Sequence, residues 1–160
     1  MAHGIFRSDS CSYTHDGALI RSAQVYDDID NGAPVLCGGL ATQGAFAGER
    51  EVFTTATATG AAAADVWVVT EPEHAYTMDK KPYENFYNAS GDIARICKLV
   101  KCDIFSITGE VCSGTPSSTN KYIAAGAAQW VASSASTKAF AQYLNTEVVG
   151  GKTMYVFEVL

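Results

Sequence analysis

Charged residues are scarce in this chain of 160 residues. Asp, Glu, Lys and Arg make up 18% of it, against about 25% in a typical soluble domain. The net charge is −6, and basic residues gather only at Lys80-Lys81 and around Lys98 and Lys101. Direct binding of nucleic acid depends on a basic stripe that displaces counterions from phosphates. We therefore expect no direct contact with nucleic acid.

Long apolar runs are also lacking. No stretch approaches the ~18 residues of a membrane-spanning helix, and the N-terminal MAHGIFRSDS has neither the basic nor the apolar region of a secretory signal. We expect a protein that folds in a cytoplasm and does not bind a membrane. Its cysteines are then expected to be free thiols packed as small apolar groups. They form no C-x-x-C pair and no standard zinc spacing: Cys11, Cys37, Cys97, Cys102 and Cys112.

Motifs for catalysis or cofactors are missing as well. The chain has no G-x-S-x-G, no P-loop and no G-x-G-x-x-G, and its histidines are His3, His15 and His74. His15 lies beside Asp16 and near Ser12, but a catalytic triad needs fixed geometry and this segment is expected to be a flexible turn. We predict that the protein is not an enzyme and has no catalytic residue and no cofactor.

Acidic residues cluster at Asp27, Asp28 and Asp30, directly before an Asn-Gly pair. The spacing is similar to that of a calcium loop, but the full pattern with its terminal glutamate is absent. Adjacent acids on a turn are usually solvated. We therefore predict no metal site.

Short strand-like segments separated by turn signals are what the chain does contain. Tyr and Phe are frequent (8 and 7), which favours strands. Asp30-Asn31-Gly32 is a strong turn signal, residues 60–64 indicate a turn or a single helical turn, and residues 139–144 stay open between helix and strand. The expected strands are residues 18–26, 34–40, 51–59, 65–70, 92–99, 104–108, 147–149 and 153–159. Residues 121–132 are expected to form either a strand pair or one strand bent at Gly126.

This pattern predicts an all-β fold, a compact antiparallel β-barrel or sandwich with an extended N-terminal arm. Residues 1–24 are expected to form the arm and the first strand region. Residues 25–160 are expected to form a single barrel or sandwich domain.

A long connection at residues 71–91 is unusually aromatic. It is interrupted by Pro72 and Pro82 and carries Tyr76, Tyr83, Phe86 and Tyr87. Long loops are often functional. Two interpretations stay open: the rings cover one end of the barrel, or they form a docking surface.

Two segments carry a resemblance to a known family. Residues 91–108 read GDIARICKLVKCDIFSIT, and residues 147–160 read EVVGGKTMYVFEVL. Together they resemble the strand pair and closing hairpin of head-decoration (capsid cement) proteins of tailed bacteriophages. Cys102 departs from the pattern, because glycine is expected before the aspartate. The matching positions are Gly91, Asp92, Ala94, Arg95, Lys101, Asp103, Phe105, Thr108, Gly150, Gly151, Tyr155, Val156 and Val159.

The resemblance implies a structural virion protein on the capsid surface, made in the host bacterial cytoplasm. Copies, as a homo-oligomer that could be a trimer, would bind across major capsid protein subunits and stabilise the assembled shell by mass action. We expect residues 4–10 to order only on assembly, by adding to a neighbour's sheet. The predicted partner-binding residues are Ile5, Phe6, Tyr76, Tyr83, Phe86 and Tyr87.

Three alternatives stay open. A phage tail-tube or head–tail connector subunit also forms a β-barrel, but tube subunits carry a long hairpin, which the sequence does not indicate unless residues 71–91 hide one. An OB-like module could stack sugars or bases on Trp67, Trp130 and the aromatic residues 83–87. An enzyme that uses cysteine and histidine would need one unusually reactive thiol.

Overall fold

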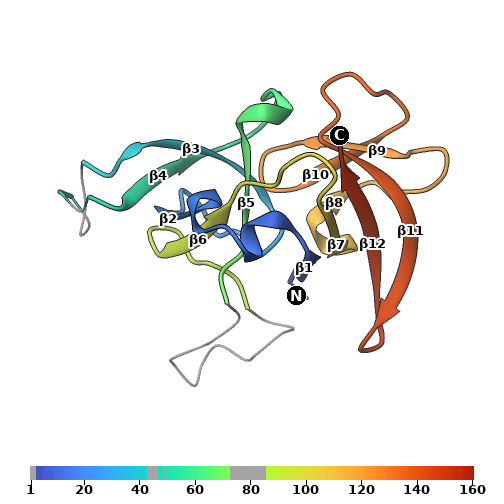
Figure 1. The fold of residues 1–160 in the computed structure, drawn as a ribbon, viewed down its shortest axis with the longest axis horizontal. Coiled ribbons are helices and arrows are strands. Elements are labelled where there is room, and N and C mark those ends of the chain that lie inside the picture. The colour runs from blue at the N-terminus through green and yellow to red at the C-terminus, as the bar shows by residue number, and fades with distance from the viewer. Residues whose placement is uncertain (1–2, 43–46, 49, 73–85) are drawn as a thin grey trace.

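The chain folds into a barrel and a sheet that lie side by side (Figure 1). The computed structural model describes residues 3–42, 47–48, 50–72 and 86–160. Within these residues a five-stranded closed barrel has the order β2-β4-β3-β5-β6. Its strands are β2 (Ile20–Gln24), β3 (Pro34–Leu40), β4 (Val52–Ala56), β5 (Val66–Val69) and β6 (Ile93–Cys97).

The second unit is a seven-stranded sheet with the order β1-β7-β12-β11-β9-β10-β8. Its strands are β1 (Phe6–Ser10), β7 (Ile104–Thr108), β8 (Cys112–Ser113), β9 (Tyr122–Ala125), β10 (Trp130–Ser133), β11 (Ala141–Val149) and β12 (Lys152–Val159). Short 3-10 turns connect the strands: η1 (Ser12–Thr14), η2 (Gly17–Leu19), η3 (Ala63–Asp65) and η4 (Gly109–Val111).

The prediction of an all-β fold is confirmed, with one addition. Two neighbouring pairs are parallel, β2 with β4 and β8 with β10, whereas the other named pairs are antiparallel. β2 closes the barrel by pairing with β4 on one side and β6 on the other. It runs parallel to β4 because the chain passes through β3 before it returns beside β2. Of residues 139–144, which the sequence left open between helix and strand, residues 141–144 form the start of β11.

The expectation that residues 4–10 order only on assembly is corrected by the structure, because they pack on the chain's own sheet. β1 pairs antiparallel with β7. The backbone N–H of Ile5 donates to Thr108 Oγ1 (3.1 Å), and the N–H of Thr108 donates to the carbonyl of Ile5 (3.2 Å). The Phe6 ring lies 5.8 Å from that of Phe105. The apolar pair therefore finds its partners within the same molecule.

One hydrophobic core joins the two units. Its centre is aromatic: the Phe105 ring lies 6.4 Å from Trp130 and 5.6 Å from Phe157, and Trp130 lies 4.7 Å from Phe140. Trp130 is fully buried and its Nε1 donates to the carbonyl of Gly32 at 2.7 Å. Since β10 carries Trp130 and Gly32 precedes β3, this bond fastens the sheet to the barrel.

Two turns depend on a left-handed backbone. Gly32 has φ +86°, and a Cβ there would lie 3.0 Å from Ile107 Cγ2, so glycine is required by both conformation and space. Cys102 has φ +73° between β6 and β7. The pattern of the resembled family has glycine at this position. Glycine adopts this left-handed conformation with the least steric strain.

Asp103 fixes the same turn from inside. It is 4% exposed, and its carboxylate accepts hydrogen bonds from the backbone and hydroxyl of Ser12 (2.9 and 2.7 Å) and from the N–H of Val100 (2.9 Å). One buried acid thus satisfies donors from η1 and from the β6–β7 turn.

Candidate functional site

The predicted partner-binding residues do not form one exposed surface in the described part of the chain. Ile5 and Phe6 are half-buried in the sheet. Phe86 is 6% exposed, so its ring is covered by the chain itself. Tyr87 is half-buried and stacks on His3 with 5.0 Å between ring centroids. Tyr76 and Tyr83 lie outside the described residues.

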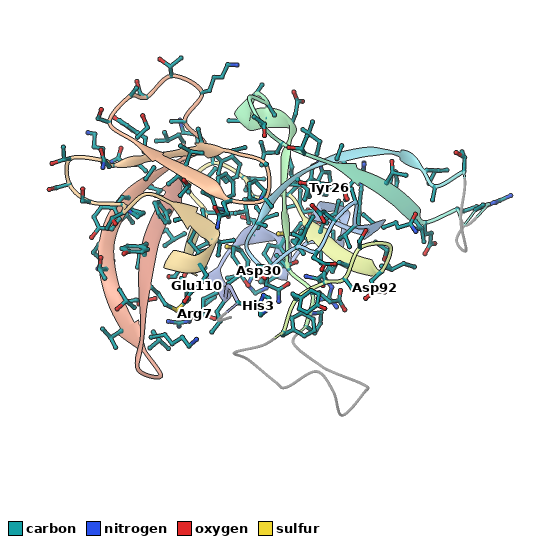
Figure 2. All side chains as sticks on the ribbon, turned by 180° about the vertical axis from the view of Figure 1, so that it is seen from behind. His3, Arg7, Tyr26, Asp30, Asp92 and Glu110 are labelled. Carbon is teal, nitrogen blue, oxygen red and sulfur yellow. The ribbon has the colours of Figure 1, made fainter. Side chains whose placement is uncertain are left out.

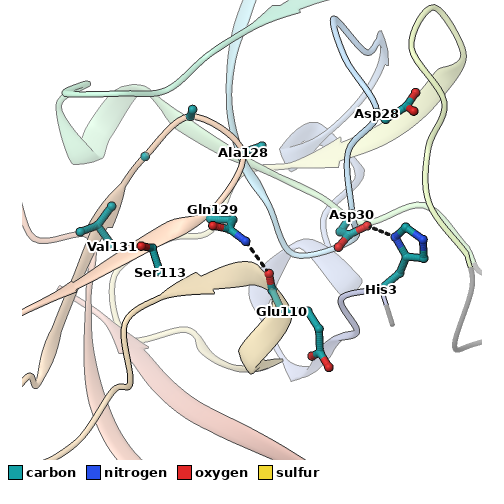
Figure 3. Close-up of a pocket in the computed structure, with 10 residues that line it drawn as sticks. His3, Asp28, Asp30, Glu110, Ser113, Ala128, Gln129 and Val131 are labelled. Carbon is teal, nitrogen blue, oxygen red and sulfur yellow. Dashed lines mark hydrogen bonds and ion pairs between the residues drawn. The ribbon is translucent and has the colours of Figure 1, made fainter. Parts of the chain in front are cut away.

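A groove of about 690 Å³ lies where the N-terminal segment, the turn before β3 and the β9–β10 loop meet (Figure 3). His3 Nδ1 is 2.7 Å from Asp30 Oδ1, and Asp30 Oδ2 accepts the N–H of Gly4 at 3.0 Å. Figure 3 shows Ser113 on the far side of Glu110 from His3. Among the described residues that line this groove, Ser113 is the one with a hydroxyl, and it does not lie beside the His–Asp pair. The pair clamps the N-terminal segment.

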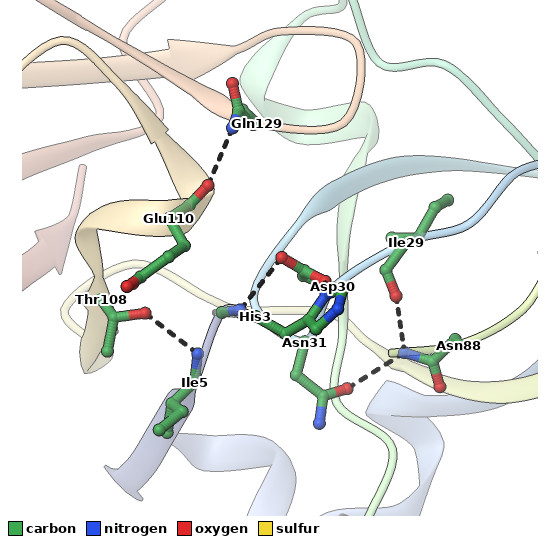
Figure 4. A network of polar contacts seen from close by, with 10 residues as sticks. His3, Ile5, Ile29, Asp30, Asn31, Asn88, Thr108, Glu110 and Gln129 are labelled. Carbon is green, nitrogen blue, oxygen red and sulfur yellow. Dashed lines mark hydrogen bonds and ion pairs between the residues drawn. The ribbon is translucent and has the colours of Figure 1, made fainter. Parts of the chain in front are cut away.

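Polar contacts around this groove serve the fold (Figure 4). The side-chain amide of Asn88 donates to the carbonyl of Ile29 (3.0 Å) and to Asn31 Oδ1 (3.3 Å). Asn31 in turn accepts the N–H of Glu71 at 3.1 Å and donates to its carbonyl at 2.8 Å. Both asparagines are buried, and their amides are satisfied by backbone groups and by each other.

Metal chemistry finds no assembled site in the part of the chain that the structure describes. No three His, Cys, Asp or Glu side chains there converge so as to hold a metal ion. All five cysteines are free. Burial raises the pKa of Cys11 to about 12, with Asp103 and Asp9 adding to the rise, and burial raises the pKa of Cys112 to about 12. Burial also raises the pKa of Cys97. These three thiols are protonated at neutral pH and poor nucleophiles.

Trp130 and Trp67 are also unsuited to stacking on an external ring. Trp130 is fully buried. Trp67 is half-buried, and the guanidinium of Arg21 lies 4.7 Å from its ring centroid. Among the described residues, no helical segment has the length and apolar character needed to cross a bilayer.

The β11–β12 hairpin is the most prominent feature of the sheet (Figure 1). The two strands pair from Ala141↔Val159 to Val149↔Lys152, with a bulge between Tyr143 and Asn145. On its other side β11 pairs with β9 only at Ala141 and Gln142, followed by one hydrogen bond from Tyr143 N–H to the Lys121 carbonyl. Within the described residues, positions 144–149 therefore form an open strand edge.

This edge, residues 144–149, is apolar and accessible. Leu144 is 44% exposed, Val148 71% and Val149 37%. Edge strands are usually protected by lysine, proline or a bulge. The segment LNTEVV contains no lysine and no proline, and its bulge lies only at the start. It can accept an added strand from another chain.

The turn end of the hairpin is held in place by polar contacts. Glu147 Oε1 accepts hydrogen bonds from Arg7 Nη1 (3.1 Å) and Ser106 Oγ (2.9 Å). Arg7 also pairs with Asp9, and Figure 2 shows Arg7 beside the hairpin. These contacts connect β11 to β1 and β7 and preorganise the edge, which lowers the entropy cost of binding.

Comparisons with protein-family models, with curated proteins and with solved structures find no match to this chain. The resemblance to head-decoration proteins therefore stays a prediction. Sequence reasoning identified the closing hairpin but not its open edge. The only signal was the unprotected Val148-Val149 pair before Gly150-Gly151.

Proposed function

We propose that the protein is a structural virion component that decorates and stabilises the outer surface of a tailed-phage capsid by binding across major capsid protein subunits. The observation that carries the proposal is the open edge of β11 at residues 144–149, with Val148 71% exposed. A strand of a neighbouring subunit can pair with this edge, and its side chains can cover the exposed valines.

The placement of the family-like segments supports this proposal. Their parts β7 and β12 are far apart in sequence yet adjacent in the sheet, with Tyr155 opposite Ile107 and Phe157 opposite Phe105. The first strand of the family-like pair, β6, does not pair with β7 but belongs to the barrel. The protein acts without chemistry: binding only to the assembled lattice shifts the equilibrium toward the intact shell.

Co-sedimentation with shells that lack the protein tests the proposal. We expect the wild-type protein to sediment with the shells and to raise their thermal disruption temperature. Val148→Asp places a charge on the open edge and is expected to weaken attachment at least about tenfold. Val131→Asp is the matched control, because Val131 of β10 is 43% exposed but lies away from the edge.

Attachment that is equal for wild type and Val148→Asp would remove the hairpin from the interface. Failure of the wild type to bind any shell would contradict capsid decoration itself. Both variants alter exposed side chains, so circular dichroism is expected to show an unchanged fold.

A second candidate, a tail-tube subunit, gains support from one observation. β11 and β12 have nine and eight residues and form a longer hairpin than the sequence indicated. Hairpins of this kind can build the inner ring of a tube. Electron microscopy of the purified assembly separates the candidates: sixfold rings indicate a tube, whereas occupancy of three- or fivefold sites on a shell indicates decoration.

A further inference from the structure

Three of the chain's four arginines line a single groove. The groove measures about 600 Å³, lies at one end of the barrel and includes Arg21, Arg50 and Arg95, together with Ser22 and Phe53. The clustering is unexpected in a chain with a net charge of −6. The positive charge of this surface therefore contrasts with that of the molecule as a whole.

Strand pairing brings these residues together. Ser22 of β2 lies opposite Arg95 of β6 on one side and Val52 of β4 on the other. Arg50 precedes β4 by two positions, and Arg21 precedes Ser22. Arg50 and Arg95 are exposed, whereas Arg21 is half-buried. The groove thus runs across the start of β2 with a cation on each flank.

Arg21 is held rigidly at this end of the barrel. Its guanidinium carbon lies 4.5 Å from the Phe53 ring centroid and 4.7 Å from that of Trp67, and Nη1 donates to Cys37 Sγ at 3.4 Å. Lys98 Nζ lies 5.5 Å from the same Trp67 ring. Burial lowers the pKa of Lys98, and the charge of Arg21 adds to that effect. Two fixed cations therefore face the same indole.

No carboxylate neutralises the three arginines of the groove within the described residues. The ion pairs there are His3 with Asp30 and Arg7 with Asp9 and Glu147. Glu51 lines the groove but pairs with none of them. Arg7, the fourth arginine, is thus the one whose charge is satisfied internally. The guanidiniums of the groove keep most of their donors available.

We propose that this arginine groove binds a carboxylate-rich segment of a partner protein. Guanidinium forks pair with carboxylates in bidentate geometry, and Phe53 and Ile20 offer apolar contact to the methylenes of glutamate side chains. A long polyanion such as nucleic acid would extend beyond the groove onto a surface that is net negative and repels it. A short acidic segment fits within the positive region. The inference does not rest on capsid decoration.

Fluorescence anisotropy with a labelled hexaglutamate peptide tests the inference. The wild-type protein is expected to bind it at low salt, to release it as salt rises and to ignore hexalysine. The double variant Arg50→Ser/Arg95→Ser is expected to weaken binding at least about tenfold, since it removes two charge-assisted contacts. Arg7→Ser is the matched control and is expected to bind like the wild type. Arg21 is left intact because it packs against two rings.

Three results would overturn the inference. The first is equal affinity of the double variant and the wild type for hexaglutamate, and the second is no binding by the wild type. The third is tighter binding of a labelled single-stranded oligonucleotide than of hexaglutamate, which would assign the groove to phosphates. Circular dichroism of the double variant checks that the barrel is intact, as expected for two exposed side chains.

Discussion

The barrel and the sheet differ in whether their strands leave unpaired edges. The five strands β2 to β6 close on themselves, so the barrel presents no edge to another chain. The seven-stranded sheet ends at β1 and β8 and leaves residues 144–149 of β11 open. A closed unit can recognise partners only through side chains, as the arginine groove does. An open one can also recognise them through its backbone.

The two units nevertheless share one hydrophobic core, so we expect them to unfold as one cooperative unit, and a substitution of Trp130 is the strongest test of this expectation. Trp130→Ala is expected to destabilise the protein by about 4 kcal/mol, because it leaves a cavity between Phe105 and Phe140 and removes the bond to the Gly32 carbonyl. Urea unfolding followed by circular dichroism measures the change. Since the bond joins sheet to barrel, native-state hydrogen exchange is expected to accelerate in both. Acceleration confined to the sheet would show that the units are independent.

Asp103 tests the connection between the two units, because it lies where the chain passes from β6 of the barrel to β7 of the sheet. Asp103→Ala leaves the N–H groups of Ser12 and Val100 without their acceptor and removes a buried carboxylate that joins them, and we expect a loss of about 3 kcal/mol in unfolding free energy. Asp9→Ala is the control. Asp9 is a largely exposed acid paired with Arg7, and its loss is expected to change stability by less than about 1 kcal/mol. Equal effects of the two substitutions would contradict the structural role of Asp103.

At the same connection, a substitution of Cys102 is expected to increase the unfolding free energy rather than lower it. Cys102→Gly is expected to raise the unfolding free energy by about 1 kcal/mol, because glycine adopts φ +73° without the steric cost that a Cβ incurs. Thermal unfolding measures the gain. Lys101→Gly, one position earlier, serves as control and is expected to give no gain. A destabilised Cys102→Gly protein would show that the thiol side chain contributes more than the backbone strain.

The smallest effect concerns the buried thiols at alkaline pH. Cys11 and Cys112 have folded pKa values of about 12, raised from the ordinary 9.0. The raised pKa belongs to the folded state. The contribution of these thiols to the unfolding free energy is therefore complete below pH 9 and declines as pH rises from 9 toward 12. Urea midpoints at pH 8 and pH 10 are expected to differ less in Cys112→Ala than in the wild type. An unchanged difference would mean that Cys112 is not buried.

Sequence reasoning succeeded where structure is decided locally. Residues 34–40 form β3 as expected, and the turn at Asp30-Asn31-Gly32 has the positive φ at Gly32 that the signal implies. It failed where distant segments meet. Ile5 and Phe6 were interpreted as a free arm because their partners, Thr108 and Phe105, lie about a hundred residues away.

Neither candidate surface could be obtained from the sequence, for the same physical reason. The open edge of β11 exists because β9 pairs with only its first residues, and strand order is a property of the whole sheet. The arginine groove unites Arg21, Arg50 and Arg95 through the pairing of β2 with β4 and β6. No local pattern indicated that these three scattered residues converge. Phe86 shows the converse, since an aromatic residue of an expected docking loop proved to be buried.

Hydrogen exchange of the β11 backbone tests the central claim most directly, namely that the open edge pairs with a partner on the virion. In the free protein, outward-facing amides of residues 144–149 are expected to exchange rapidly, because they have no partner in the described chain. On protein bound to phage shells, the same amides are expected to be protected as a neighbouring strand pairs with them. Shells that carry the protein while residues 144–149 exchange as fast as in solution would contradict the account.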